Sequence, residues 1–115
     1  MKLLIVGSRS IKDFSFAGLV PKQTSLIITG GADGIDALAE GYADKNGLSK
    51  LVLRPRYDLY GRCAPLKRNE KMAELCDMAL IIWDGTSRGT EYTAKYARKI
   101  GKEVVLILKK EGEEK

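Results

Sequence analysis

The sequence predicts a three-layer α/β fold in which one mainly parallel, five-stranded sheet lies between two layers of helices. Two observations predict it: five short apolar runs are spread through the 115 residues, and segments with helical periodicity separate most of them. Buried strands that alternate with helices form parallel sheets covered on both faces. Because crossovers between parallel strands are right-handed, few topologies remain, and a Rossmann-like sandwich with the strand order 3-2-1-4-5 is favoured.

The five apolar runs are the predicted strands. Each is short and lacks the polar alternation of a half-exposed strand, which is typical of strands buried on both faces of a sheet. They cover residues 2–6, 26–29, 51–53, 78–83 and 104–108.

The clearest predicted helix covers residues 33–46. Its apolar residues recur at the i, i+3, i+4 spacing of one helix face, and Gly47 follows where a left-handed C-terminal cap belongs. Further helices are predicted at 65–76, where proline is tolerated in the first turn, and at 90–100. A short helix is also expected within residues 13–20.

Length and composition predict one domain over residues 1–110, followed by a charged tail at 111–115. The net charge of +5 is compatible with a nucleic-acid partner and equally with a pocket for a small anion. No stretch approaches the roughly 20 apolar residues of a membrane span, and the N-terminus does not read as a signal peptide. We therefore expect a cytoplasmic protein without a membrane partner.

Missing residue types limit the possible chemistry. The chain contains no His, which removes His-based acid–base catalysis and the usual zinc sites. Its two cysteines, Cys63 and Cys76, form no CxxC pair and are expected to be reduced, largely buried thiols. We expect no metal ion and no other cofactor.

Polar or glycine-rich loops follow three of the predicted strands. In such sheets ligands bind beyond the carboxyl ends of the strands, where the strand order reverses, here between the first and fourth strands. The loops that fall there are Gly7-Ser8-Arg9, Gly30-Gly31-Ala32-Asp33-Gly34 and Asp84-Gly85-Thr86-Ser87-Arg88-Gly89-Thr90. Glycine lets backbone N–H groups approach a ligand, and a following helix N-terminus favours an anion. Arg9 and Arg88 are expected to hold a phosphate from two sides.

Several loop side chains also have a purely structural interpretation. Asp33 and Thr90 suit the N-terminal caps of helices, and Ser8 suits a turn. Asp36 lies at the edge of the buried helix face, so we expect it to contact a neighbouring loop or a ligand hydroxyl.

Other polar and aromatic residues lie outside the loops. Trp83 is expected in the core or at its rim rather than against a base, and Tyr92 and Tyr96 in a packing or interface stripe. Arg68 and Asn69 lie inside the third predicted helix, on its core side, where capping explains neither. A buried arginine needs an acidic side chain or an anionic ligand, and the ligand interpretation is favoured.

Three stretches, at residues 28–39, 60–72 and 83–90, carry a family resemblance. In this order and at these separations they resemble the YspA/YpsA-related branch of the SLOG superfamily. That superfamily joins the DprA DNA-processing proteins with the LOG ("lonely guy") phosphoribohydrolases. The resemblance implies a Rossmann-like fold and a pocket for nucleotides or nucleotide-derived molecules. Members occur in bacteria and phages, and several are proposed sensors of nucleotide signals.

Carried over residue by residue, the resemblance marks ligand-binding positions in all three loops and in the third helix. They are Gly7, Ser8, Arg9, Gly30, Gly31, Gly34, Asp36, Arg68, Asn69, Ser87, Gly89 and Thr90, to which the loop argument adds Arg88.

Two departures from the family pattern bear on function. The second loop often carries a basic residue where this chain has Asp33. The LOG signature Pro-Gly-Gly-x-Gly-Thr-x-x-Glu ends in a catalytic Glu, whereas here Glu91 follows Thr90 directly. On a helix this displacement turns the side chain by about 200°, so Glu91 is disfavoured as a catalytic acid.

Three functions remain open from the sequence. The favoured one is a sensor-like protein that binds a nucleotide or nucleotide derivative. The first alternative is cleavage of the N-glycosidic bond of a nucleoside 5′-monophosphate, which needs a carboxyl group. Among Asp36, Asp84 and Glu91, Asp84 at a strand tip is the best placed for it.

The second alternative is DprA-like binding of single-stranded DNA, which needs basic residues interleaved with exposed aromatics. A short pattern of this kind is formed by Arg54, Arg56, Tyr57, Tyr60 and Arg62. We rank a pocket lid above a DNA groove for this segment. A homo-oligomer that completes the pocket is also expected, with Tyr92 and Tyr96 as candidate contacts.

Overall fold

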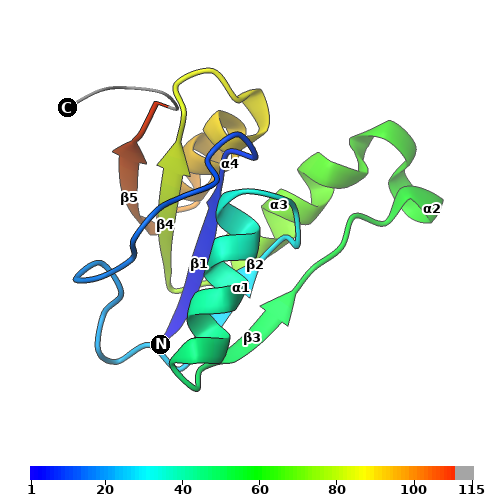
Figure 1. The fold of residues 1–115 in the computed structure, drawn as a ribbon. Helices are drawn as coiled ribbons and strands as arrows, with labels where there is room; N and C mark the ends of the chain where they lie inside the picture. Colours follow the sequence, from blue (N-terminus) through cyan, green and yellow to red (C-terminus); the bar gives the residue numbers. More distant parts are fainter. Residues whose placement is uncertain (111–115) are drawn as a thin grey trace.

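The computed structural model describes residues 1–110 and has a five-stranded sheet at its centre (Figure 1). The strands are β1 (Lys2–Gly7), β2 (Leu26–Thr29), β3 (Ser49–Val52), β4 (Met78–Trp83) and β5 (Glu103–Leu108). They pair in the order β3-β2-β1-β4-β5, and every pair is parallel. The predicted Rossmann-like α/β fold and its strand order are confirmed, with a fully rather than mainly parallel sheet.

Helices cover both faces of this sheet. Helix α1 (Ile35–Lys45) covers one face, and α3 (Ala64–Leu75) and α4 (Arg88–Lys99) cover the other. Between β3 and α3 lie a short helix, α2 (Tyr57–Tyr60), and a 3-10 turn, η1 (Gly61–Cys63), neither of which the sequence predicted. Figure 1 shows α2 at the far end of α3, away from the sheet.

The alternation of side chains along the central strands divides the core into two layers. On β1, Leu3 and Ile5 are buried on the α1 side, while Leu4 and Val6 are buried on the side of α3 and α4. Because both faces are covered, the central strands read as continuous apolar runs, as the sequence indicated.

The prediction of a short helix within residues 13–20 is wrong. The chain there is an irregular connection with a single turn near its end. Ile11 and Phe16 from this connection are nonetheless buried on the α1 side, and the Phe16 ring meets Tyr42 edge-on at a centroid distance of 5.7 Å. The connection therefore buries its apolar side chains without the cost of nucleating a short helix.

The two outer strands correct a second expectation, that all five strands are buried on both faces. Residues 49–51 of β3 are exposed, with Leu51 at 40%, and β5 is only partly buried. The outer strands each have one unpaired edge because they end the sheet. They are only partly covered because the helices pack over the central strands.

The cysteines are only partly as expected. Cys76 is buried, but Cys63 is exposed in the turn before α3, so the expectation of two buried thiols is wrong for Cys63. Both are free thiols. Within the described residues, no helix is long and apolar enough to cross a membrane. The predicted tail at 111–115 lies outside them.

Helices α3 and α4 are joined by a pair of tyrosines. Tyr92 donates a hydrogen bond to Glu70, and Tyr96 donates one to Glu74 at 2.7 Å. The two rings stack at a centroid distance of 6.3 Å. The two tyrosines hold α4 against α3. Together these helices form one wall of the cavity described next.

Candidate functional site

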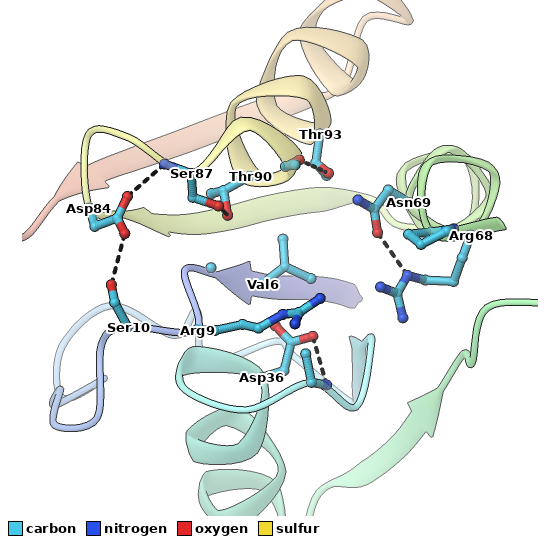
Figure 2. Close-up of a pocket in the computed structure, with 14 residues that line it drawn as sticks. Val6, Arg9, Ser10, Asp36, Arg68, Asn69, Asp84, Ser87, Thr90 and Thr93 are labelled. Carbon is cyan, nitrogen blue, oxygen red and sulfur yellow. Dashed lines mark hydrogen bonds between the residues drawn. The ribbon is translucent and has the colours of Figure 1, made fainter. Parts of the chain in front are cut away.

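The carboxyl ends of β1 and β4 open into a polar cavity of about 390 Å³, the first cavity, at the position that the strand order predicts (Figure 2). Its walls come from the loops after β1, β2 and β4 and from α1, α3 and α4. The lining residues are Val6, Gly7, Arg9, Ser10, Ala32, Asp36, Pro65, Arg68, Asn69, Asp84, Ser87, Gly89, Thr90 and Thr93. Most of the predicted ligand-binding residues are among them.

Ser8 joins the loops beneath this cavity and does not line it. The side chain is fully buried, and its Oγ accepts a hydrogen bond from the backbone N–H of Asp84 at 3.0 Å. Its carbonyl accepts the N–H groups of Ile11 and Ile35. Ser8 therefore sets the relative positions of the β1 loop, the β4 loop and the start of α1.

Asp84 is occupied by hydrogen bonds. Its Oδ1 accepts the N–H groups of Thr86 and Ser87 at 2.9 and 2.8 Å and the Thr86 hydroxyl, and its Oδ2 accepts the Ser10 hydroxyl at 2.8 Å. Desolvation opposes ionisation, but these hydrogen bonds outweigh it and hold the pKa of Asp84 well below its usual range. Such a carboxylate shapes a loop and is poorly suited to acid–base chemistry.

The N-terminus of α4 faces the cavity without a side-chain cap. Ser87 is the N-cap residue, but its hydroxyl pairs with that of Thr90 at 3.1 Å instead of capping a backbone N–H. Within residues 1–110, the N–H groups of Arg88, Gly89 and Thr90 meet no acceptor. Trp83 closes this turn by donating its indole N–H to the Ser87 carbonyl at 2.8 Å.

Asp36 forms the floor of the cavity on the α1 side. It is 4% exposed, and its Oδ2 accepts the N–H groups of Gly30 and Ala32 at 3.2 and 3.3 Å. This is the loop contact that the sequence suggested. Burial raises the pKa of Asp36, although these hydrogen bonds and the nearby Arg68 charge oppose the shift. Its Oδ1 is buried and has no hydrogen-bond partner within the described chain.

Arg68 reaches across from α3 to the ends of β2 and β3. Its Nη1 donates to the carbonyls of Gly30 and Leu53 at 2.7 and 2.9 Å, and its Nε donates to Asn69 Oδ1 at 2.7 Å. The side chain is half-buried, and neutral oxygens satisfy these donors. The acidic partner that its position suggested is not in direct contact, since no ion pair of Arg68 occurs within residues 1–110.

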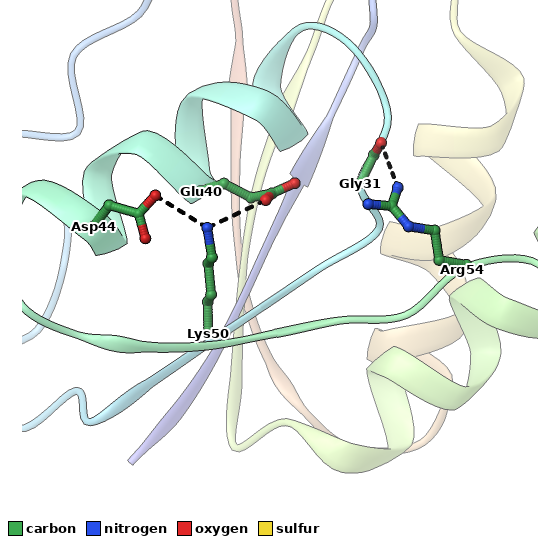
Figure 3. Close-up of polar contacts among 5 residues, drawn as sticks. All are labelled: Gly31, Glu40, Asp44, Lys50 and Arg54. Atoms are coloured by element: carbon green, nitrogen blue, oxygen red, sulfur yellow. Dashed lines mark hydrogen bonds and ion pairs between the residues drawn. The ribbon is translucent and has the colours of Figure 1, made fainter.

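A second cavity, of about 290 Å³, adjoins the first and shares Arg9, Ala32, Pro65 and Arg68 with it. Gly30, Gly31, Asp33, Arg54, Pro55 and Tyr57 complete its lining. Figure 3 shows Arg54 reaching from the segment after β3 to Gly31. Nη1 of Arg54 donates a hydrogen bond of 3.1 Å to the Gly31 carbonyl. The sequence placed Arg54 in a lid or DNA groove and missed this contact.

The loop glycines leave space for the protein's own groups. A Cβ at Gly30 would lie 2.7 Å from Arg68 Nη1 and 2.8 Å from Asp36 Oδ2. Gly34 has a φ of 74°, and a Cβ there would meet the Ser8 carbonyl at 2.5 Å. The close approach that the sequence assigned to a ligand is thus made first by neighbouring side chains and backbone.

Two of the predicted residues line neither cavity, and a third, Asp33, does not form the predicted helix cap. Arg88 is exposed and lines neither cavity, so the two-arginine clamp with Arg9 is not formed. Glu91 pairs with Lys95 one turn later on α4 and is also outside both cavities. Asp33 makes no capping hydrogen bond, because α1 begins at Ile35 with Gly34 as its N-cap residue.

Comparison with protein-family models, with curated proteins and with solved structures finds no match. The SLOG resemblance thus rests on the sequence motifs, and the function rests on this geometry.

The structure also adds wall residues that sequence reasoning missed. Ser10, Pro65 and Thr93 line the first cavity. Their one available signal was position: Ser10 follows a predicted loop, and the other two lie one turn from predicted site residues on their helices.

Proposed function

We propose that the first cavity binds the phosphate and the sugar of a nucleotide. The observation that carries this proposal is the uncapped N-terminus of α4 at the cavity wall, with three backbone N–H groups that lack an acceptor within residues 1–110. Unpaired N–H groups and the positive end of the helix dipole together favour a phosphate. Arg9, which makes no hydrogen bond or ion pair within those residues, adds a guanidinium group from the opposite loop.

The α1 and α3 sides of the cavity suit a hydroxyl-bearing sugar. Asp36 lines this part of the cavity, and its Oδ1, which has no hydrogen-bond partner within residues 1–110, can accept a ligand hydroxyl once the carboxyl group turns toward the cavity. Asn69 uses its oxygen to accept from Arg68, which leaves its amide N–H groups to donate. A polar cavity of this size falls within the range of small-molecule sites.

Binding is better supported than N-glycosidic cleavage. Cleavage requires a carboxyl group that can exchange a proton or stabilise a developing cation. Asp84 is occupied by its own loop, and Glu91 lines neither cavity. Asp36 does line the first cavity, but its Oδ2 is occupied by the N–H groups of Gly30 and Ala32. This favours the sensor-like function that the SLOG resemblance implies.

DNA binding has less support. Arg56, which the DNA hypothesis requires, is held in a two-point ion pair by Asp58 at 3.0 and 2.8 Å. Its charge is thus partly neutralised by a neighbour.

Thermal denaturation with AMP, CMP, GMP and UMP tests the proposal. At least one should raise the melting temperature in a concentration-dependent way and be recovered unchanged. Arg9→Gln should weaken that binding roughly ten- to hundredfold, since charge-assisted hydrogen bonds contribute about 1.5–3 kcal/mol. Arg98→Gln removes the same charge at an exposed position near the end of α4, which lines neither cavity, and should leave the affinity unchanged. The proposal fails if no monophosphate shifts the melting curve.

A further inference from the structure

The second cavity carries more positive charge than the first. Arg9, Arg54 and Arg68 line it, and Asp33 is its one acidic residue. The first cavity, in contrast, is lined by as many carboxylates as guanidinium groups. The second cavity therefore attracts an anion. The even distribution of basic residues along the sequence did not indicate this.

Two of these guanidinium groups, those of Arg54 and Arg68, are held in place without being neutralised. Arg54 donates to the Gly31 carbonyl, and Arg68 donates to the carbonyls of Gly30 and Leu53. Within residues 1–110, none of the three arginines forms an ion pair with a carboxylate. Neutral oxygens fix the direction of a guanidinium group and leave its charge available.

The charges also act on one another. Burial is the main cause that lowers the pKa of Arg68, and the positive charges of Arg9 and Arg54 lower it further. The nearby Asp36 carboxyl and Tyr57 raise the pKa of Arg68, and each has a larger effect than either arginine. The second cavity thus brings three guanidinium groups together with a single lining carboxylate, which favours the binding of an anion.

We propose that the second cavity binds a second anionic group of the same ligand. This inference rests on the proposed function and names its ligand class, a nucleotide with two separate or linked phosphates. Because the cavities share Arg9 and Arg68, one molecule can place one phosphate at the N-terminus of α4 and the other beside Arg54. Arg54 lines the second cavity and not the first, so its side chain is specific to the second phosphate.

Isothermal titration calorimetry of the full chain tests this with three ligands. They are the best-binding 5′-monophosphate and, on the same nucleoside, the 5′-diphosphate and the 3′,5′-bisphosphate. At least one doubly phosphorylated ligand should bind roughly tenfold more tightly than the monophosphate, as expected of an added charge-assisted contact. Whether this is the diphosphate or the bisphosphate identifies how the two groups are joined.

Two variants make the test specific. Arg54→Gln should abolish the gain from the second phosphate and leave monophosphate binding unchanged. Arg62→Gln removes an exposed arginine that lines neither cavity and should preserve both affinities. The inference is overturned, with the proposed function intact, if the monophosphate binds and neither second phosphate adds affinity, or if Arg54→Gln preserves the gain. If none of the three ligands binds, both proposals fall.

Discussion

Gly30 lies between two charged side chains that come from different helices. Asp36 of α1 accepts its N–H, and Arg68 of α3 donates to its carbonyl. Both contacts use the space that a side chain would occupy at this position. One small residue thus fixes the loop after β2, the floor of the first cavity and an arginine shared by both cavities.

The substitution Gly30→Ala should destabilise the protein by about 1–3 kcal/mol, because the new methyl group displaces Asp36 or Arg68 from its hydrogen bonds. Gly41→Ala is the matched control. Gly41 lies inside α1 with nothing within 4 Å of its added Cβ, so that variant should be stabilised by roughly 0.5–1 kcal/mol. Urea denaturation measures both. Equal effects of the two variants would contradict the assigned role of Gly30.

Asp36 should make stability depend on pH in the less usual direction for a carboxyl group. Burial raises its pKa in the folded state, so the folded protein holds this proton more tightly than the unfolded chain does. The contribution is present below the unfolded pKa, about 3.9, and is lost as pH rises through the folded pKa.

The variant Asp36→Asn carries no titrating group at this position. Its free energy of unfolding, relative to the wild type, should therefore increase as pH rises from 4, by at most about 1.4 kcal/mol per pH unit. Urea denaturation between pH 3.5 and 7 measures this difference, in which the other titrating groups cancel. A difference that stays flat or falls with pH would mean that burial does not govern Asp36.

Strand β3 is an open edge of the sheet, and its charges protect it. Lys50 lies on this strand and forms ion pairs with Glu40 at 3.4 Å and Asp44 at 3.0 Å, both on α1 (Figure 3). A lysine on an edge strand hinders pairing with the edge of another molecule. Ion pairs this exposed add little to folding stability, so the main effect of Lys50 is expected on association.

Replacing Lys50 with isoleucine should increase concentration-dependent aggregation, because it removes the edge charge and adds a strong strand-former. Static light scattering over a protein concentration series measures this. Lys99→Ile makes the same change at an exposed position in the last turn of α4, away from the edge. It should scatter less than Lys50→Ile. Indistinguishable behaviour would show that surface hydrophobicity alone is responsible.

The two adjoining cavities assemble from segments far apart in the chain. Arg9 follows β1, Arg54 follows β3 and Arg68 belongs to α3, and only the parallel sheet brings them together at one end. The chain's net charge of +5 gave no sign of this concentration, since its basic residues are spread throughout the sequence. The strand order, with its reversal between β1 and β4, decides where the charge gathers.

The fold could be predicted from local sequence because its signals are local. Strand and helix periodicity, together with the right-handed crossover rule, favoured the order β3-β2-β1-β4-β5 and a crevice at the ends of β1 and β4, where the first cavity opens. The failures have local causes as well. The connection at 13–20 carries apolar residues that pack without forming a helix, and α2 is too short to leave a periodic pattern.

What the sequence alone established is thus the sheet, its order and the edge of the sheet at which the cavities open. Which loop residues line those cavities was decided by tertiary contacts between distant segments. The Asp84 carboxylate accepts hydrogen bonds from its own loop, and Ser8 lies beneath the first cavity. Arg88 is exposed to solvent, whereas Arg54 lines the second cavity together with Arg9 and Arg68. Side-chain direction in a loop depends on which hydrogen-bond partners the fold brings within reach, and residue type and spacing do not encode those partners.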